Sequence, residues 1–386
     1  MTDRVVTSDL GSGSSQSPDA LLEVRDLRTY FKTDDGIVKA VDGVSFDIRP
    51  GQTVGVVGES GSGKSVTMMS ILDLNPKPGR ISVRDDTAPG EQMEAFLRGS
   101  KKHVSVSTGE ALFRGENLLQ ASKRRLRALR GSEISMIFQD PMTSLNPVLT
   151  VGDQLVEAVM LHQDVTTRQA RQLALEGLKE VGIPRAERRI DDYPHQFSGG
   201  MRQRVMIAMA LINDPALLIA DEPTTALDVT TQAQILGLIQ QLQRDHGTAV
   251  VLITHDLGVV AETADDIVVM YAARVAEHAP VYSLFEQPLH PYTWGLLGSL
   301  PRLDVELERL TQIVGQPPSL LRPPRGCRFR PRCSFAFDRC RQELPEALPA
   351  TFDESHLAAC FLPEERKLAE SKRVVTELAL DSEAAA

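Results

Sequence analysis

A glycine-rich loop constrains the fold of this chain more than any other feature. The loop, Gly58-Glu-Ser-Gly-Ser-Gly-Lys-Ser65, follows a short apolar segment, 54–57, and precedes a segment of helical composition, 65–72. It matches the pattern G-x-x-x-x-G-K-[ST], whose glycines allow backbone N–H groups to surround phosphates. We therefore predict an α/β nucleotide-binding fold, with Lys64 at the β- and γ-phosphates and Ser65 at Mg²⁺. The predicted nucleotide-binding positions are Gly58, Glu59, Ser60, Gly61, Ser62, Gly63, Lys64, Ser65 and Val66.

A second apolar strand ends in two adjacent carboxylates. Residues 217–222 read Leu-Leu-Ile-Ala-Asp-Glu. Because α/β folds bind their ligands at the carboxyl ends of strands, we expect Asp221 to lie near Mg²⁺ and Glu222 to face the attacking water. Two acids at a strand end are, by themselves, more typical of a protein surface. Together with the phosphate loop they predict ATP hydrolysis, with Glu222 as the general base.

The class of ATPase is indicated by Phe197-Ser-Gly-Gly-Met201, which lies just before the acidic strand. This sequence resembles the LSGGQ signature of ABC ATPases, with Phe in place of Leu and Met in place of Gln. Ser198, Gly199, Gly200 and Met201 begin a helix whose N-terminal N–H groups can hold the γ-phosphate of ATP on a partner cassette.

Two further polar residues follow the order of the ABC family. Gln139 matches the Q-loop glutamine, and the resemblance implies that it joins Ser65 and Asp221 as a Mg²⁺ ligand. His255 follows an apolar strand and matches the switch histidine that contacts the γ-phosphate. A single histidine in this position is usually structural, but the ordered set of motifs favours a catalytic role.

Three assignments of the resemblance concern the edges of the site. Asp228 lies in the sequence that matches the D-loop. Phe31 matches the aromatic residue that stacks on adenine, and Tyr30 is the alternative. Val66 occupies a position where many relatives have a hydroxyl group, so we expect one contact to the α-phosphate to be missing.

Longer stretches resemble one branch of the family, the importers of peptides and nickel. They read MIFQDPMTSLNPVLTVGDQL, YPHQFSGGMRQR, ADEPTTALDVTTQAQIL and ITHDLGVVAE. His290-Pro-Tyr-Thr293 and Gly315-Gln-Pro-Pro318 resemble the C-terminal extension of oligopeptide and dipeptide transporter ATPases, so the resemblance covers about 21–362. It implies an ATPase subunit that powers peptide import. Dipeptides, longer peptides and nickel chelates remain open as solutes.

The resemblance also implies partners. These are two membrane permease subunits, an extracytoplasmic peptide-binding protein and a second cassette, since an ABC site combines the phosphate loop of one cassette with the signature of another. A related second ATPase is favoured, and a homodimer remains open. The net charge of −10 argues against a nucleic-acid partner, because phosphate backbones bind basic patches.

The expected location is the cytoplasmic face of the inner membrane, with peripheral attachment. The first twenty residues lack the apolar core of a secretory signal. The apolar runs are also shorter than the roughly 20 residues that span a bilayer.

Two other classes of protein compete with an importer ATPase. Non-transport ABC proteins of translation usually hold two cassettes in one chain, and those of DNA repair usually carry coiled-coil or zinc insertions. We identify neither feature. A P-loop kinase has no role for the signature sequence or for His255.

The expected organisation is an ABC nucleotide-binding domain with a small C-terminal extension. The domain, 21–285, would contain a RecA-like core, an antiparallel β part and a helical subdomain at about 140–212, with a polar insertion at about 85–106. The expected extension, 286–362, is a separate module, and 1–20 and 363–386 are expected to be tails.

All four cysteines lie in the extension, at Cys327, Cys333, Cys340 and Cys360. The spacing C-x₂₋₄-C that usually begins a structural zinc site is missing. Four thiolates are the usual ligands of a [4Fe–4S] cluster, and the six arginines between 325 and 341 suit an anionic cluster. Some members of the resembling family carry such a cluster here. We therefore favour iron–sulfur, while zinc and unliganded reduced thiols remain open.

Overall fold

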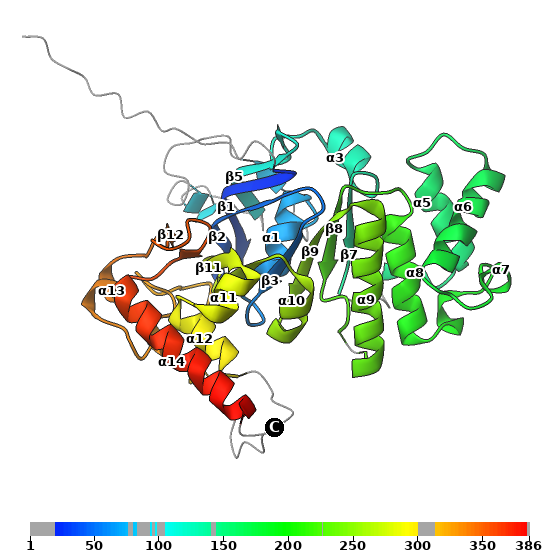
Figure 1. The fold of residues 1–386 in the computed structure, drawn as a ribbon. Helices are drawn as coiled ribbons and strands as arrows, with labels where there is room; N and C mark the ends of the chain where they lie inside the picture. The colour runs from blue at the N-terminus through cyan, green and yellow to red at the C-terminus, as the bar shows by residue number, and fades with distance from the viewer. Residues whose placement is uncertain are drawn as a thin grey trace, which may run out of the picture.

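The computed structural model of this chain describes residues 20–75, 80–82, 93–94, 97–98, 105–139, 144–225, 227–299 and 313–383. The predicted N-terminal tail, apart from residue 20, lies outside these residues, as does most of the predicted polar insertion. The described chain forms a sheet flanked by helices, a second sheet beside it, and a group of helices at one end (Figure 1).

The central sheet contains five parallel strands. In spatial order they are β10 (Asp266–Tyr271), β3 (Thr53–Val57), β9 (Ala249–Thr254), β8 (Leu217–Asp221) and β7 (Ile134–Ile137). Every residue of β3, β8 and β9 is buried, which explains why these strands read as continuous apolar runs. Because the strands run in the same direction, the phosphate loop and the two carboxylates lie at one edge of the sheet.

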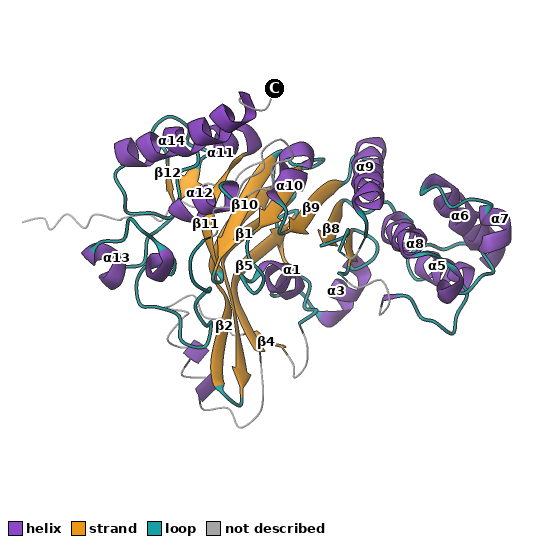
Figure 2. Ribbon diagram, turned by 90° about the horizontal axis from the view of Figure 1, so that it is seen from below, coloured by secondary structure: helices purple, strands orange, loops and turns teal. Residues whose placement is uncertain are grey.

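Helices cover both faces of this sheet (Figure 2). On one face α1 (Lys64–Ile71) places Met68 in the same buried cluster as Ile219. On the other face α9 (Val229–His246) packs in a cluster that contains Leu218. Since side chains alternate along a strand, neighbouring residues of β8 bury against opposite helices. This packing fixes the strand end from which Asp221 and Glu222 project.

The second sheet is mainly antiparallel and agrees with the predicted antiparallel β part. Its strands are β1 (Leu22–Thr33), β2 (Gly36–Ile48), β4 (Arg80–Ser82), β5 (Ser105–Phe113) and β6 (Glu116–Asn117). Phe113 of β5 and Phe46 of β2 join the same buried cluster as Met68 of α1, so this sheet packs on the helix that follows the phosphate loop.

Helices lie in the range where we expect the helical subdomain. Its elements are α5 (Val151–Met160), α6 (Thr167–Glu180), α7 (Ala186–Arg189), η1 (Pro194–Gln196) and α8 (Gly199–Leu211), and a short helix, α3 (Lys123–Leu129), precedes β7. Thr150 and Thr166 cap the first two of these helices by accepting hydrogen bonds from backbone N–H groups. The subdomain lies at the opposite end of the molecule from the C-terminal extension (Figure 1).

The C-terminal extension is joined to the central sheet. Its elements and those leading to it are α10 (Leu257–Thr263), β11 (Arg274–Pro280), α11 (Val281–Glu286), α12 (Pro291–Leu297), η2 (Arg330–Arg332), α13 (Asp338–Gln342), β12 (Leu348–Pro349), β13 (Leu357–Ala358) and α14 (Glu364–Glu383). β13 pairs with β11, so the extension is not the separate module that we predicted.

Most of the predicted C-terminal tail is the helix α14. Its Glu364 carboxylate accepts hydrogen bonds from the backbone and hydroxyl of Thr351. Arg366 lies over the ring of Phe335, and Ser371 is buried. Contacts with the extension therefore hold this helix in place.

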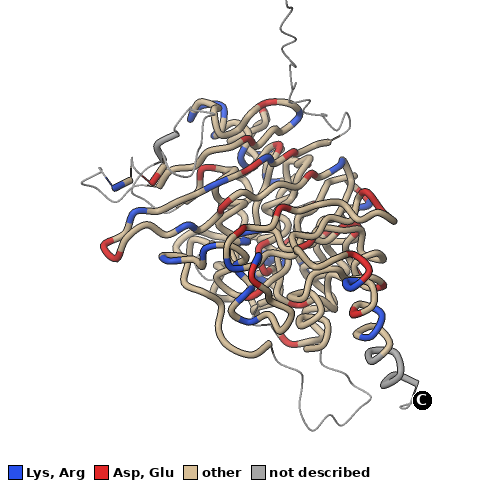
Figure 3. The backbone as a smooth tube through the Cα atoms, turned by 90° about the vertical axis from the view of Figure 1, so that its left-hand side faces the viewer, with Lys and Arg blue, Asp and Glu red and all other residues tan. Residues whose placement is uncertain are grey.

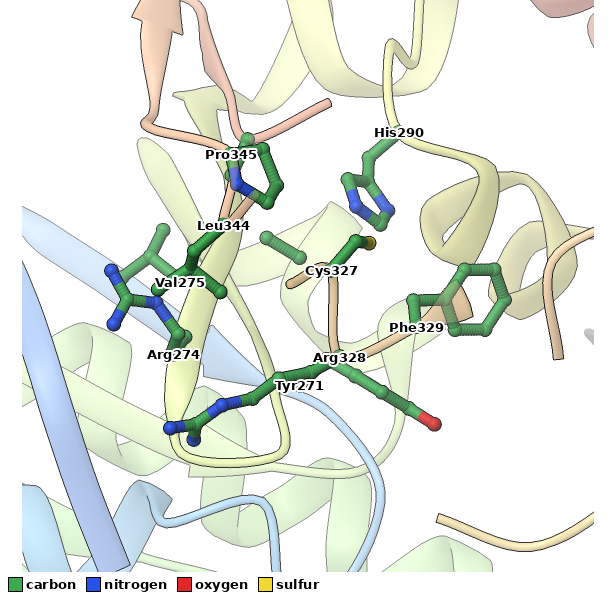
Figure 4. A pocket seen from close by; sticks show the side chains of 11 residues that line it. Tyr271, Arg274, Val275, His290, Cys327, Arg328, Phe329, Leu344 and Pro345 are labelled. Carbon is green, nitrogen blue, oxygen red and sulfur yellow. The ribbon is translucent and has the colours of Figure 1, made fainter. Parts of the chain in front are cut away.

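A buried carboxylate connects the extension to the antiparallel sheet. Asp42 of β2 accepts hydrogen bonds from Arg328 of the extension, from Arg28 at 2.7 Å and from the Tyr30 hydroxyl at 2.6 Å. Arg274 lies 3.6 Å away. Arg328 and Arg274 both border the cavity between the extension and β11 (Figure 4).

Candidate nucleotide-binding and hydrolysis site

The phosphate loop connects β3 to α1 and contains two glycines that no other residue could replace without strain. Gly58 has a φ of +147°, and a Cβ there would lie 2.1 Å from the carbonyl oxygen of Met270. Gly63 has a φ of +100°, and a Cβ there would lie 2.4 Å from the carbonyl oxygen of Ala40. Both backbones lie in the region that favours glycine. The loop therefore packs closely against β10 and β2.

Lys64 begins α1, and its side chain folds back over the loop. Its Nζ donates hydrogen bonds to the carbonyl oxygens of Gly58, at 2.7 Å, and Glu59, at 3.1 Å. Burial lowers the pKa of this ammonium, although Glu222 and Asp221 oppose that effect. The Ser62 hydroxyl is buried and has no hydrogen-bond partner among the described residues. The loop thus contains a cation and a hydroxyl without a partner, two groups that can bind a phosphate.

Two of the three predicted Mg²⁺ ligands, Ser65 and Asp221, are adjacent. The Ser65 hydroxyl donates a 2.7 Å hydrogen bond to Oδ1 of Asp221. Burial raises the pKa of Asp221, and the charge of Glu222 adds to the rise. A hydroxyl and a carboxylate are oxygen donors of the kind that Mg²⁺ takes beside substrate phosphates, so these two residues fit the ion. Among the described residues, Gln139 forms its side-chain hydrogen bond with Glu222 and not with this pair.

Glu222 lies where three segments of the chain meet. Gln139 Nε2 and the Thr225 hydroxyl donate to its Oε2, at 2.8 and 2.9 Å. His255 Nδ1 lies 3.6 Å from its Oε1. The residue has a φ of +45°, and its N–H donates to the Ile253 carbonyl oxygen at 2.9 Å, which fixes the turn after β8. The carboxylate is therefore oriented by neighbours on both oxygens.

The signature sequence begins α8. The Ser198 hydroxyl caps this helix by accepting a 3.4 Å hydrogen bond from the N–H of Met201. A Cβ on Gly200 would lie 2.8 Å from Thr231 of α9. Among the described residues, neither a hydrogen bond nor an ion pair connects 198–201 to the phosphate loop, and α8 lies beyond β8 from α1 (Figure 1). The two halves of an ABC site are thus separate within one chain.

Asp228, the predicted D-loop residue, caps α9. Its carboxylate accepts hydrogen bonds from the N–H of Thr231, at 2.9 Å, and from the Thr231 hydroxyl, at 2.7 Å. These bonds lower the pKa of Asp228. The residue that follows, Val229, is 85% exposed, which leaves an apolar side chain at the surface beside the D-loop.

The two candidates for the adenine contact, Tyr30 and Phe31, differ in burial. Tyr30 is buried, and its hydroxyl is bonded to Asp42. Phe31 is half-buried and points to the other face of β1, because side chains alternate along a strand. Tyr30 is therefore a buried residue of the sheet, and Phe31 remains the candidate for the adenine contact. Val66 packs against the core cluster that contains Met68.

A mainly apolar groove lies next to the Q-loop. It has a volume of about 370 Å³ and lies between β7, α5 and α8. Its lining includes Met136, Phe138, Leu161, Met206 and Met209. Phe138, which directly precedes Gln139, is 41% exposed, and Leu161 is 70% exposed. No sequence pattern predicted this groove, because its walls come from distant segments.

The four cysteines line one small cavity in the extension, together with residues such as His290 and Phe329. All four are free thiols. Burial raises the pKa of Cys333 to about 12 and that of Cys360 to about 11. Within the described residues, however, no group of three or more His, Cys, Asp or Glu side chains is arranged to hold a metal ion. The geometry therefore does not support the predicted iron–sulfur cluster, and it supports zinc no better.

Comparison with known proteins decides the family. The ABC transporter model matches residues 41–225, and the model of the C-terminal region of oligopeptide/dipeptide transporters matches residues 276–340. The oligopeptide transport ATP-binding protein OppD of Salmonella typhimurium is 47% identical over 361 residues, which are 94% of this chain and 99% of the relative. The chain belongs to the oligopeptide/dipeptide family of ABC transporter ATP-binding proteins. The predicted resemblance is confirmed, and the chain is an ABC ATPase rather than a P-loop kinase.

Two further comparisons agree with this family. The dipeptide transport ATP-binding protein DppD of Bacillus subtilis is 49% identical over 346 residues, which are 90% of this chain and 96% of the relative. The solved dimeric structure of the ATP-binding cassette MJ0796, bound to ADP and Pi after hydrolysis, has 27% identity and a TM-score of 0.55. It covers 67% of this chain and 98% of its own. No helix in the described ranges is long and apolar enough to cross a membrane.

Proposed function

We propose that this chain is the ATP-hydrolysing subunit that powers import of dipeptides or oligopeptides across the cytoplasmic membrane. The observation that carries the proposal is the combination of a phosphate loop, Asp221 and Glu222 with the C-terminal region matched at 276–340. Two relatives whose alignments cover at least 90% of this chain are named oligopeptide and dipeptide transport ATP-binding proteins. The chain would act at the cytoplasmic face of that membrane. Acidic and basic segments are interspersed on the side in Figure 3, which favours a protein partner over nucleic acid.

In the proposed reaction, ATP binds with its phosphates in the loop 58–65 and its adenine against Phe31. Ser65 and Asp221, with Gln139 as the predicted third ligand, would hold Mg²⁺, which would neutralise charge on the phosphates. Glu222 takes a proton from the attacking water, which is a general-base role. Gln139 and Thr225 hold its carboxylate, and His255 contacts the γ-phosphate.

The active unit is proposed to be a head-to-tail pair of cassettes. The separation of 198–201 from the phosphate loop supports this arrangement, as does the dimeric form of the related cassette MJ0796. Ser198, Gly199, Gly200 and Met201 then cover the ATP of the partner. Closure of the pair around ATP would move the attached permeases, because ATP binds both cassettes only in the closed state.

We assign the permease-binding surface to the groove beside Phe138. Its lining is mainly apolar, its volume of about 370 Å³ suits a short helix or turn, and two of its apolar residues, Phe138 and Leu161, are exposed. Exposed apolar patches of this kind mark protein interaction sites. The cassette is proposed to span 21–285, with the helical subdomain at about 140–212 forming one wall of the groove and with 286–362 as its extension.

For the four cysteines we propose a [4Fe–4S] cluster from the residue types alone, because the described side chains are not arranged to hold a metal ion. Supporting this proposal, all four side chains border one cavity, and four thiolates are the ligand set of such a cluster. A role in holding the extension together is expected, because the residues of hydrolysis lie elsewhere.

The proposed function is tested by copurification. The chain, tagged at its N-terminus and expressed with its neighbouring permease genes, is expected to retain two permeases in detergent. A Phe138→Asp variant should lose them, while Val229→Asp, an exposed apolar residue outside the groove, should keep them. Equal recovery of permeases with both variants would contradict the groove assignment, and no recovery with the wild type would contradict the transport function.

A further inference from the structure

We propose that the C-terminal extension is part of the nucleotide site, and that Arg332 and Tyr292 are positioning residues for the phosphate loop. Both act on Glu59, the second residue of the loop, from positions 273 and 233 residues further along the chain. This inference rests on the proposed ATPase function. It gives the extension a role in ATP affinity.

The first contact is a two-point ion pair. Arg332 Nη1 donates to Glu59 Oε2 at 2.7 Å, and Nη2 donates to Oε1 at 3.0 Å. The Arg332 side chain is 4% exposed and that of Glu59 is 27% exposed. Two parallel hydrogen bonds between planar groups fix orientation as well as distance. The carboxylate of Glu59 is therefore fixed to the extension.

Arg332 is itself anchored by the rest of its donors. Its Nε donates to the Val314 carbonyl oxygen at 3.1 Å, and Nη2 donates to that of Ile313 at 3.0 Å. Nη1 also reaches the Tyr271 hydroxyl at 3.4 Å. A guanidinium has five N–H donors, and these contacts with those to Glu59 use all five. Lysine, with three donors on a flexible stem, cannot reproduce this arrangement.

The second contact holds the backbone of the same residue. The N–H of Glu59 donates to the Tyr292 hydroxyl at 2.9 Å. Tyr292 is fully buried on α12, and its ring packs against Tyr271 and Phe329, with centroids 4.6 and 5.5 Å apart. Phe329 and Tyr271 both line the cavity of Figure 4. The position of the hydroxyl is thus fixed by packed aromatic rings, of which Tyr292 and Phe329 belong to the extension and Tyr271 to β10.

Glu59 transmits this restraint to the phosphate site. Its carbonyl oxygen accepts one of the two hydrogen bonds that hold Lys64 Nζ. A loop that is ordered before ATP arrives loses less conformational freedom on binding, so its affinity is higher. Release of Glu59 is therefore expected to weaken ATP binding. It should leave hydrolysis of bound ATP nearly unchanged, because Glu222 lies on a different segment.

The test is the affinity of the full chain for a fluorescent ATP analogue, with KM and kcat for ATP measured in the assembled transporter. Arg332→Met should weaken binding about tenfold, equivalent to ~1.4 kcal/mol. Tyr292→Phe removes one oxygen and should weaken binding about threefold. KM should rise in the same proportion while kcat changes less than about twofold. The control Arg341→Met, in the same extension and exposed, should bind like the wild type.

A double-mutant comparison distinguishes a positioning role of Arg332 from a role in packing alone. In a Glu59→Gln background, Arg332→Met should add less than about twofold, because its partner has already lost its charge. Wild-type affinity in the folded Arg332→Met and Tyr292→Phe variants would overturn the inference. So would a full tenfold effect in the Glu59→Gln background, or lower thermal stability without any change in affinity. If the wild-type chain itself failed to bind the analogue, the proposed ATPase function would be wrong.

Discussion

Gln139 Nε2 lies 2.8 Å from Glu222 Oε2, so the residue beside the apolar groove is hydrogen-bonded to the proposed general base. The preceding residue, Phe138, lines the groove that we assign to the permeases. A permease segment in the groove would therefore lie one residue from a side chain that orients Glu222. Neighbouring residues of the chain therefore connect the proposed permease-binding groove to Glu222, the proposed general base.

The role of Glu222 is tested by Glu222→Gln, which preserves shape and removes the proton acceptor. ATP hydrolysis should fall by ~10²–10⁴-fold, the usual contribution of a general base, while ATP binding is retained. Phosphate release and ATP binding are the two measurements. Glu262→Gln, at an exposed position, is the control and should hydrolyse ATP normally. Activity above about a tenth of wild type in Glu222→Gln would exclude it as the main base.

The head-to-tail dimer is tested with one variant cassette and one wild-type partner. Lys64→Ala should weaken ATP binding at the site that contains this chain's phosphate loop. Ser198→Arg should instead impair the site whose loop belongs to the partner. Site-specific crosslinking of an azido-ATP to each chain distinguishes the two. Loss of labelling confined to this chain's own loop in Ser198→Arg would refute the arrangement.

The buried carboxylate Asp42 is expected to dominate the stability of the extension's attachment. Asp42→Asn leaves Arg328 and its neighbours without their charged partner, and removal of one member of a buried pair typically costs about 3–5 kcal/mol. Asp191→Asn breaks the pair with Arg171, whose side chains are 63% and 45% exposed, and should cost about 0–1 kcal/mol. Urea unfolding of both variants measures the difference. Equal stability of the two would contradict the account.

The same residue predicts a dependence on pH. Burial opposes ionisation of Asp42, but Arg328, the Tyr30 hydroxyl and Arg274 outweigh it and hold the pKa of Asp42 below its usual value. The stabilisation is therefore complete above the unfolded pKa of about 4 and is lost as the pH falls through the lower folded value. Between about pH 5 and pH 2 the wild type should lose more stability than Asp42→Asn. Parallel loss in the two proteins would show that other groups are responsible.

The proposed cluster is tested by elemental analysis of protein purified without oxygen. Four-cysteine ligation predicts about four iron atoms and inorganic sulfide per chain, with a brown colour. Removal of the iron by a chelator should lower the melting temperature of the extension. One zinc per chain, or neither metal, would reject the cluster, and the second result would leave four buried reduced thiols.

Local sequence predicted the parts of the site that lie within single motifs. The phosphate loop, Asp221 and Glu222 were identified because a strand end fixes where its next residues lie. The contacts of Glu59 could not be predicted in this way. Arg332 is one of six arginines between 325 and 341, and nothing in their spacing distinguishes the one that is 4% exposed against the loop.

Tertiary packing also explains the main departures from the expected organisation. The pairing of β13 with β11 depends on two residues in each strand, which is too short a pattern to recognise in the sequence. The segment of helix α14 was expected to be a tail because the family resemblance ends at about residue 362. Its first turn is held by Glu364 and Thr351 instead.

The central claim is that hydrolysis by this chain drives peptide import. The most direct measurement is uptake of a labelled oligopeptide by proteoliposomes that contain the chain, its ATPase partner, two permeases and the binding protein. Uptake is expected to require ATP on the side of the cassettes and to be abolished by Glu222→Gln. Uptake that continues in Glu222→Gln, or hydrolysis that does not respond to the peptide-loaded binding protein, would contradict the account.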